Sequence, residues 1–236
     1  MRILALETTE KFGSVALLDG HHVLAELVLP KDQRSSQTLH PTLYSLFETT
    51  QTNPKDIAAV AVVVGPGSFT GLRVGVTSAK VFAYITGAKV IALDTFQTVA
   101  AAIGSSRLIS VGVDAQRGEV VAAVLRQTEN RCFETVRKSE LLAVNDWWNH
   151  AELYSDVLFA GPALERWSKQ APPHAILAPE ADWFPKASSA GILAAERIAL
   201  GRFDDEWELL PIYSRLSAAE EKSGKSSILQ TPEFRS

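Results

Sequence analysis

Residues 57–86 read IAAVAVVVGPGSFTGLRVGVTSAKVFAYIT, the most distinctive pattern in the 236-residue chain. The first eight residues are apolar and rich in valine, which is typical of a strand buried on both faces. Three glycines follow within seven residues and permit a tight turn and a close backbone approach. The pattern then becomes helical and ends before Gly87, a residue type that commonly terminates helices. The stretch therefore predicts a strand, a glycine loop and a helix over 69–86.

The segments before this stretch predict an antiparallel opening. Apolar runs at 3–6, 13–18 and 23–29 indicate three strands, and the Asp-Gly pair at 19–20 favours a hairpin turn between the last two. A helix is expected over 36–49, because its leucines recur at helical spacing. After residue 86 we expect a strand at 90–93 and a short helix to 103, capped by an Asp-Thr pair.

The second half of the chain repeats this plan. Strands are expected at 108–113, 118–125 and 132–136, and Asp114 ends the first of them as Glu7 ends the opening strand. Short strands at 157–160 and 174–177 and a helix over 188–200 complete this half. The repetition predicts an α/β protein with two lobes of one plan, each a mixed sheet of three antiparallel strands plus parallel strands flanked by helices.

The repeated plan gives the expected lobe boundaries, and the composition excludes several classes of protein. We expect an N-terminal lobe over 1–104, a C-terminal lobe over 105–216 whose last helix packs near the first lobe, and a disordered tail over 217–236 with little apolar content.

A net charge of −4 argues against direct RNA binding, which needs a cationic surplus. Cys132 is the sole cysteine and is expected as a buried thiol in a strand. The absence of a membrane-length apolar run or a signal peptide favours the cytoplasm.

The glycine loop allows three interpretations. A Walker phosphate loop is excluded, because no Gly-Lys-Ser/Thr follows. A dinucleotide site would use Asp94 on a ribose, although the antiparallel opening is foreign to that fold. An anion site at the helix N-terminus and a purely structural turn both remain open. The residues that could contact a nucleotide or an anion are Glu7, Thr8, Gly65, Gly67, Ser68, Thr70, Arg73 and Asp114.

No catalytic centre or metal site is visible in the sequence. His21 and His22 are adjacent and point to opposite faces of a strand, and His40, His150 and His174 stand alone. No serine or cysteine is placed beside a base in a recognisable nucleophile pattern. Trp147 and Trp148 are expected to pack near a helix end.

At this point a family resemblance adds information. The segment GPGSFTGLRVGVTSAKVFA at 65–83 resembles the signature of the bacterial TsaB (YeaZ) proteins, paralogues of the TsaD transferases in the actin-like ATPase (ASKHA) superfamily. The opening ILALETTEKFGSVALL, the segment VDAQRGEVVAAVL at 113–125 and PIYSR at 211–215 are similar to other family segments in the same order. The family often has Asp at position 7 and His-Ser-Glu where this chain has Ser35-Ser36-Gln37.

The resemblance implies a function and partners. It implies a two-lobed actin-like, ribonuclease H-like fold and a non-catalytic scaffold subunit that pairs with TsaD and works with the ATPase TsaE. Together these would form N6-threonylcarbamoyladenosine beside the anticodon of tRNAs that read codons beginning with A, with tRNA contacted only indirectly. No cofactor is expected, although weak binding of ATP or ADP with Mg²⁺ at the interlobe cleft or the complex interface stays open.

We hypothesise that the helices at 36–49 and 69–86 dock on TsaD, with a homodimer through the same surface in isolation. Gly71, Gly75 and Ala79 lie four residues apart and form a small-residue ridge that allows close helix approach. Packing of this ridge on its own sheet is the alternative. On the docking hypothesis, Gly75→Leu would abolish pairing and leave the isolated protein folded. The expected contact residues are Leu39, Leu43, Phe47, Gly71, Leu72, Gly75, Val76, Ala79 and Ala83.

Two enzymatic alternatives remain. An ATP-dependent small-molecule kinase of the same superfamily would use Glu7 and Asp114 around Mg²⁺ and the glycine loop on phosphate. A dinucleotide-dependent enzyme would bind NAD(P). Calorimetry with each nucleotide separates these alternatives from the scaffold.

Overall fold

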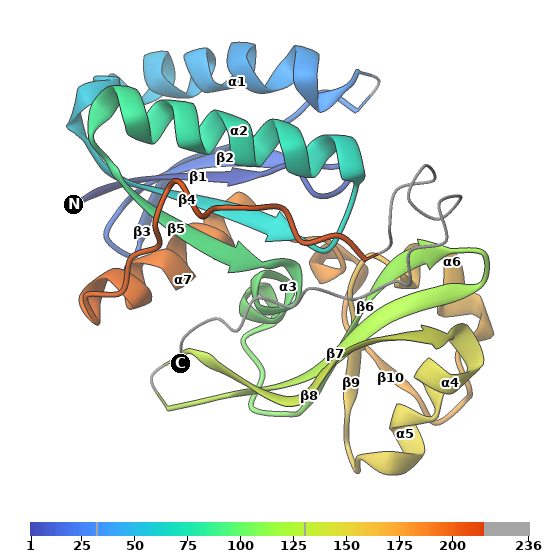
Figure 1. Ribbon diagram of the computed structural model, residues 1–236. Helices are drawn as coiled ribbons and strands as arrows, with labels where there is room; N and C mark the ends of the chain where they lie inside the picture. Colours follow the sequence, from blue (N-terminus) through green and yellow to red (C-terminus); the bar gives the residue numbers. More distant parts are fainter. Residues whose placement is uncertain (32, 130, 215–236) are drawn as a thin grey trace.

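The first sheet has five strands in the order β3-β2-β1-β4-β5 (Figure 1). In the computed structural model, which describes residues 1–31, 33–129 and 131–214, the first three strands are antiparallel and β4 and β5 run parallel to β1. The bounds are β1 (Arg2–Glu7), β2 (Ser14–Asp19), β3 (His22–Val28), β4 (Ile57–Gly65) and β5 (Lys89–Asp94). The strands agree with the sequence patterns to within one or two residues at each end.

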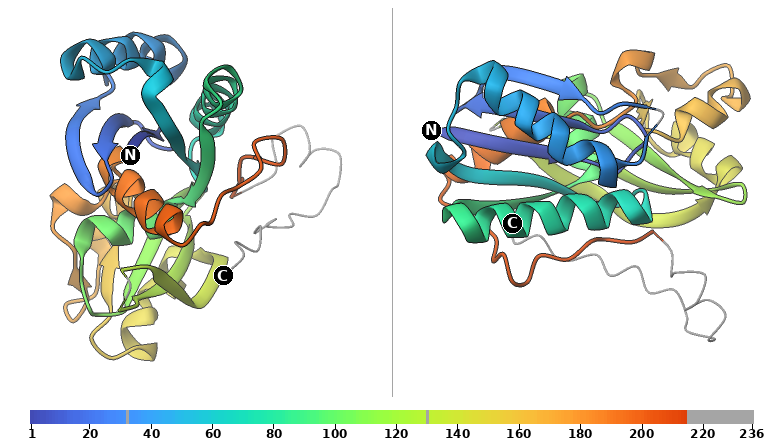
Figure 2. Two further views of the ribbon diagram at one scale, coloured as in Figure 1. Left: turned by 90° about the vertical axis from the view of Figure 1, so that its left-hand side faces the viewer. Right: turned by 90° about the horizontal axis from the view of Figure 1, so that it is seen from above.

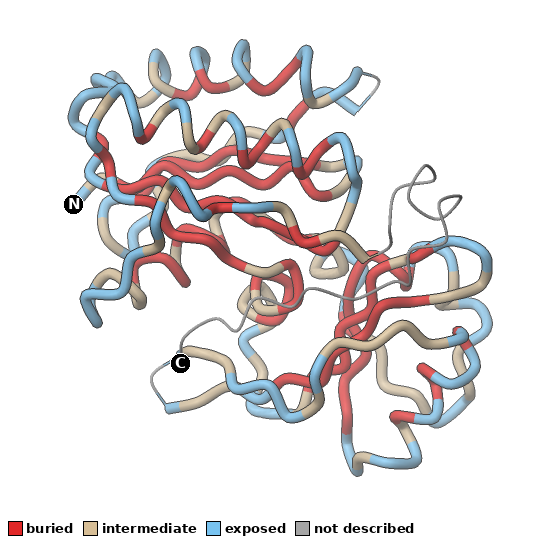
Figure 3. The backbone as a smooth tube through the Cα atoms, in the orientation of Figure 1, coloured by how far each residue is buried: buried red, intermediate tan, exposed pale blue. Residues whose placement is uncertain are grey.

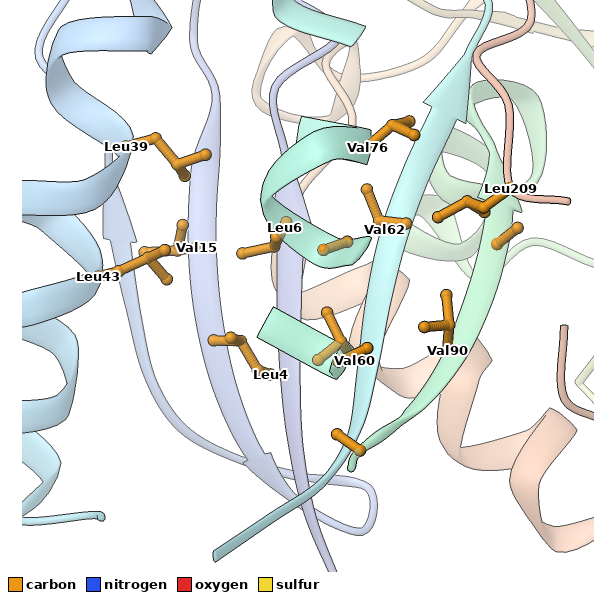
Figure 4. Close-up of a cluster of buried hydrophobic side chains, with 14 of the residues drawn as sticks. Leu4, Leu6, Val15, Leu39, Leu43, Val60, Val62, Val76, Val90 and Leu209 are labelled. Atoms are coloured by element: carbon orange, nitrogen blue, oxygen red, sulfur yellow. The ribbon is translucent and has the colours of Figure 1, made fainter. Parts of the chain in front are cut away.

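Helices cover both faces of this sheet because both faces of its central strands are apolar. Leu4 and Leu6 of β1 point toward α1 (Ser35–Thr50) and α2 (Phe69–Thr86), and Figure 4 shows this cluster with Leu39 of α1. Ile3 and Ala5 point to the opposite face, where α7 (Ala187–Ala199) packs. The lobe is therefore a three-layer sandwich.

The second sheet repeats the topology in the order β10-β9-β6-β7-β8, with β6, β7 and β8 antiparallel and β9 and β10 parallel to β6. This confirms the expected fold class. The strand bounds are β6 (Ile109–Gln116), β7 (Glu119–Gln127), β8 (Phe133–Ala143), β9 (Leu158–Ala160) and β10 (Ile176–Leu177). The helices of this half are α4 (Val144–Trp148), α5 (His150–Leu153) and α6 (Leu164–Trp167), with 3₁₀ turns η2 (Ser168–Gln170) and η3 (Glu180–Asp182). A third 3₁₀ turn, η1 (Pro54–Asp56), precedes β4.

Helix α3 (Thr95–Ile103) lies between the two sheets (Figure 1). Phe96 and Val99 of this helix join the apolar cluster on one face of the second sheet. The other face is covered by Trp147, which stacks on Trp148 with ring centroids 4.6 Å apart, as expected for packing residues. Helix α7 returns to the first sheet although it follows the second in sequence, so the chain crosses between lobes twice.

Several sequence expectations differ from the structure. Cys132 lies just before β8 and is half-buried, so the expected buried strand thiol is wrong. The strand expected at 132–136 is longer, because residues up to Ala143 pair with β7. Helix α4 ends at Trp148, in agreement with the helix end expected near Trp147 and Trp148. Helices α5 and α6 were not expected, since segments of four residues carry too little periodicity to be recognised. The end of PIYSR and the tail over 217–236 fall outside the described residues. No described helix combines the length and apolarity that crossing a bilayer requires.

After α7, residues 203–213 form a segment without helix or strand, with a β-bridge at Asp204 and a turn at 206–208, that we call the strap. It runs along the side of α2 that faces away from α1 (Figure 2). Asp204 pairs with the edge strand β5, its backbone nitrogen donating to the Val90 carbonyl at 2.9 Å. Further along, the Ile212 nitrogen donates to the Val64 carbonyl at 2.7 Å. Leu209 and Ile212 complete the apolar core beneath α2. The other residues of the strap are exposed or half-buried, and Figure 3 shows the strap coloured by burial.

Candidate functional site

The glycine loop is filled by the chain's own β1–β2 turn. Thr8 Oγ1 donates a hydrogen bond to the Gly71 carbonyl at 2.8 Å, and the Ser68 nitrogen donates to the Thr9 carbonyl at 2.6 Å. A Cβ atom at Gly67, Gly71 or Gly75 would lie within 3.0 Å of an atom of Thr8 or Thr9. These glycines are therefore required for contact between α2 and the first turn of the chain.

The same contact changes the environment of the α2 N-terminus. Ser68 is the N-cap residue, and its Oγ accepts from the Gly71 nitrogen at 3.3 Å. The carbonyl oxygens of Thr8 and Thr9 face the loop, and carbonyl oxygens repel an anion. The first-turn residue Thr70 is exposed. The structural interpretation of the loop accounts for its glycines, and a nucleotide or anion contact here stays a prediction.

Gly65 and Arg73 contact the strap. A Cβ at Gly65, whose φ is +121°, would lie within 3.0 Å of the Ile212 carbonyl oxygen. The Arg73 guanidinium stacks over the Phe69 ring, 3.9 Å from its centroid, and its Nε donates to the Tyr213 hydroxyl at 3.0 Å. This exposed arginine is thus held by aromatic groups although its charge opposes the helix dipole.

Glu7 is fully buried at the end of β1. Its Oε1 accepts from both the backbone nitrogen and the hydroxyl of Thr9 at 2.5 Å, while Oε2 is buried and has no hydrogen-bond partner among the described residues. Burial raises the pKa of Glu7 to about 7 in spite of the Thr9 hydrogen bonds. Burial also raises the pKa of Glu10 to about 8, with the charges of Glu7 and Asp114 adding to the effect.

Asp114 belongs to the second lobe and does not contact Glu7 directly. Its Oδ1 accepts from the Gln116 nitrogen at 2.9 Å and its Oδ2 lies 3.4 Å from Arg166. Glu10, between the two acids, was missed by the sequence analysis because nothing local distinguishes it from an ordinary loop acid. Lys11 reaches Glu165 of α6 at 2.6 Å, so the β1–β2 loop also joins the lobes. In the described part of the chain, no three His, Cys, Asp or Glu residues are grouped to hold a metal ion.

Asp94, the acid of the dinucleotide interpretation, is a helix cap. Its Oδ1 accepts from the Gln97 nitrogen at 2.7 Å at the start of α3, and burial raises its pKa to about 6. The antiparallel β1–β2–β3 edge also differs from a dinucleotide-binding sheet. The cap expected from the Asp-Thr pair is confirmed.

Most of the expected docking side chains point toward the sheet of their own lobe, as the alternative interpretation of the small-residue ridge expects. Phe47 is half-buried and stacks on Phe82 of α2, with centroids 6.0 Å apart. The others are buried beneath α1 and α2 because a helix directs its small and apolar stripe toward its own sheet. These buried residues are Leu39, Leu43, Gly71, Leu72, Gly75, Val76, Ala79 and Ala83. Whether the pair of helices contacts another protein stays a prediction.

The outer face of the two helices is poor in charge. α1 has one charged residue in 16, Glu48, and α2 has two in 18, Arg73 and Lys80, whereas charged residues make up 21% of the chain. Large apolar side chains are exposed there instead. They are Tyr44 of α1 and Phe69, Val81, Tyr84 and Ile85 of α2. Depletion of charge together with exposed aromatic residues is typical of the centre of a protein interface.

Two five-stranded mixed sheets of the same topology, flanked by helices, define a two-lobed α/β protein. Residues 22–198 match a family model described as "TsaD: tRNA N6-adenosine threonylcarbamoyltransferase". The chain belongs to the TsaB (YeaZ) family of tRNA threonylcarbamoyladenosine biosynthesis proteins, as the relatives below show.

The tRNA threonylcarbamoyladenosine biosynthesis protein TsaB of Bacillus subtilis is 31% identical over 228 residues, which span 94% of this chain and 97% of that protein. TsaB of Escherichia coli is 34% identical over 152 residues, or 60% of this chain and 64% of that protein. The solved structure of YeaZ from Pseudomonas aeruginosa has a TM-score of 0.75 and 22% identity, covering 90% of this chain and 99% of that one. This likeness supports the fold.

Proposed function

We propose that this chain is an accessory subunit that pairs with a TsaD-type transferase and, with TsaE, supports formation of N6-threonylcarbamoyladenosine in tRNAs that read codons beginning with A. The family supplies the pathway, and the charge-poor outer face of α1 and α2 is the observation that carries the pairing. The first lobe, proposed to span 1–104, would present this face. The second lobe, proposed to span 105–216, would support it through α7.

The filled glycine loop supports an accessory role over a catalytic one. In a phosphate-binding loop, backbone N–H groups point at an open space that receives the anion. Here the Thr9 carbonyl accepts a hydrogen bond from the Ser68 nitrogen, and the Thr8 carbonyl oxygen lies against Gly71. A cytoplasmic location follows from the proposed tRNA pathway. tRNA would be contacted through the complex, and the same face would form a homodimer in the absence of TsaD.

The proposal is tested by reconstitution with purified TsaD and TsaE and unmodified tRNA. Ile85 is 74% exposed, so Ile85→Glu leaves the core intact and places a charge in the proposed interface. We expect loss of copurification with TsaD and of tRNA modification. Leu153→Glu is the matched control, because Leu153 of α5 is 61% exposed on the other lobe. Equal modification by both variants and the unchanged protein would refute the pairing face.

Calorimetry with ATP and Mg²⁺ tests the kinase alternative. The accessory role predicts no binding tighter than millimolar by the isolated chain. Micromolar binding with turnover of a small molecule would replace the accessory role with a kinase.

A further inference from the structure

The strap presents the large side chains of Trp207 and Leu210 to solvent. Trp207 is 69% exposed and Leu210 is 68% exposed, although Leu209 and Ile212 of the same segment are buried. The Trp207 ring lies against Tyr84 of α2, with centroids 6.1 Å apart in an edge-to-face arrangement. The exposed apolar surface of α2 therefore continues onto the strap without interruption.

The backbone of the strap is fixed while these side chains stay outside. Lys80 Nζ of α2 donates to the carbonyls of Trp207 and Leu209 at 3.2 and 3.3 Å. Asp204 Oδ2 accepts from the Ala92 nitrogen at 2.8 Å on the edge of the sheet. A surface tryptophan on a fixed backbone loses little conformational entropy on binding, which is a property of interface anchors.

Three acidic residues neighbour this apolar centre in the sequence. Asp205, Glu206 and Glu208 flank Trp207 in sequence, and Asp205 Oδ1 accepts from the Trp207 nitrogen at 2.7 Å. Across the described ranges, none of these three carboxylates has an ion-pair partner within 4.0 Å. An apolar centre beside an acidic rim, by which we mean Asp205, Glu206 and Glu208, is complementary to a basic surface that contains an apolar pocket.

This charge pattern selects the occupant. RNA is disfavoured because its phosphates would meet the acidic rim. A second copy of the chain is disfavoured because a two-fold contact places the same patch on both sides and would bring the two acidic rims together. A different polypeptide with a basic, apolar-centred surface fits both features.

We propose that Trp207, Leu210 and the acidic rim of the strap form a third docking element beside α1 and α2, and that it binds a basic surface around an apolar pocket on the TsaD-type subunit. This inference rests on the proposed function, and it adds a charge-specific contact that the two helices do not provide. Trp207 is its anchor, and Glu206 and Glu208 provide its electrostatic steering.

The test uses the full-length chain and the purified TsaD-type subunit, with affinity and rates measured by surface plasmon resonance at several salt concentrations. We expect Trp207→Ala to weaken the Kd at least ~10-fold, as for interface tryptophans. The double change Glu206→Gln/Glu208→Gln should slow association roughly 3- to 10-fold at low salt and reduce its salt dependence. Leu153→Ala and Glu152→Gln, on exposed α5 positions, are the matched controls and should change neither quantity by more than about twofold.

The outcomes separate this inference from the proposed function. If Ile85→Glu abolishes pairing while Trp207→Ala and the double change behave as the unchanged chain does, the strap contact is refuted and the accessory role stands. If the unchanged chain does not bind the TsaD-type subunit, both fail. If Trp207→Ala alters only self-association, measured by analytical ultracentrifugation, or only tRNA retention on a filter, the assigned partner is wrong. Circular dichroism and the melting temperature verify that each variant is folded.

Discussion

The hydroxyl of Thr8 donates a hydrogen bond of 2.8 Å to the carbonyl of Gly71, joining the first turn of the chain to a helix 63 residues later. Both residues are buried, and the contact requires glycine at 71 and at 75. The family signature around residues 65–83 is therefore in part a packing requirement of the first lobe.

Gly71→Ala is expected to destabilise the fold by about 1–3 kcal/mol, because its Cβ would clash with the Thr8 carbonyl oxygen. Alanine in a helix normally stabilises relative to glycine by about 1 kcal/mol, so the sign is diagnostic. Urea unfolding followed by circular dichroism measures the change. Thr77→Ala, at an exposed position of the same helix, should change stability by less than about 0.5 kcal/mol. A Gly71→Ala protein as stable as the unchanged chain would contradict the clash.

The same geometry argues against one part of the expectation for Gly75→Leu, namely that the isolated variant stays folded. A Cβ at Gly75 would lie within 3.0 Å of Thr8 Oγ1, so even Gly75→Ala should destabilise the isolated chain. Thr8→Ala in the same protein removes the obstructing oxygen. A double-mutant cycle should show a coupling free energy of at least about 0.5 kcal/mol between the two positions. Additive effects would mean that the two side chains do not meet.

Glu7→Gln is expected to stabilise the protein at pH 8 and to have little effect at pH 5. The ordinary pKa of this carboxyl is 4.5 and burial raises it to about 7 in the folded protein. The folded state therefore binds the proton more tightly, and stability falls as the pH rises from about 4.5 to about 7. Glutamine imitates the protonated form, so its advantage should grow over this window to about 2–3 kcal/mol. Urea unfolding at pH 5, 6, 7 and 8 measures the difference, and a difference independent of pH would contradict the shift.

His150 should make the protein sensitive to acid. Its Nδ1 lies 2.8 Å from the Ser110 hydroxyl, which accepts from Trp147 Nε1 at 2.9 Å, so the hydroxyl is left to donate to Nδ1. Burial lowers the pKa of His150 to about 4. A lowered pKa means that the folded state resists protonation, so stability is lost as the pH falls from about 6.5 toward 4.

His150→Asn keeps an acceptor near Ser110 but cannot be protonated. We expect this variant to be less stable at pH 7 by about 1–3 kcal/mol, because it leaves a cavity, and to lose less stability than the unchanged protein between pH 7 and pH 5. Parallel pH profiles for the two proteins would show that another group is responsible. Thermal unfolding in matched buffers provides the comparison.

Lys80→Met should release the middle of the strap, because Lys80 Nζ supplies the hydrogen bonds to the carbonyls of Trp207 and Leu209. Hydrogen exchange of peptides covering 205–210 should accelerate about 10-fold or more, since exchange reports local opening. Peptides from β4 should be unaffected. Lys89→Met on the exposed start of β5 is the control, and equal protection in both variants would show that the strap is held by other contacts.

The elements of both lobes could be predicted from local patterns. The valine-rich run at 57–64, the hairpin pair at 19–20 and the glycine after residue 86 each act within a few residues, so their strand, turn and helix end appear where expected. The bounds of the short helices after β8 could not be predicted, because segments of four or five residues carry too little periodicity and depend on burial against the second sheet. The strap was not predicted either, because its strand-like pairing is confined to Asp204 and leaves no alternating pattern in the sequence.

The amino-acid sequence by itself determined the order of the elements, the repeated lobe plan and the family, because periodicity and glycine spacing are local and are preserved along the chain. Only the tertiary structure decided which way α2 faces, which carboxyl groups are buried and where apolar surface remains exposed. From the sequence, the small-residue ridge could have contacted another protein, yet the Thr8–Thr9 turn of the same chain packs against its glycines. Packing partners and desolvation depend on residues that are distant in sequence. Only the tertiary structure therefore shows that the exposed Tyr84 and Trp207 belong to one surface.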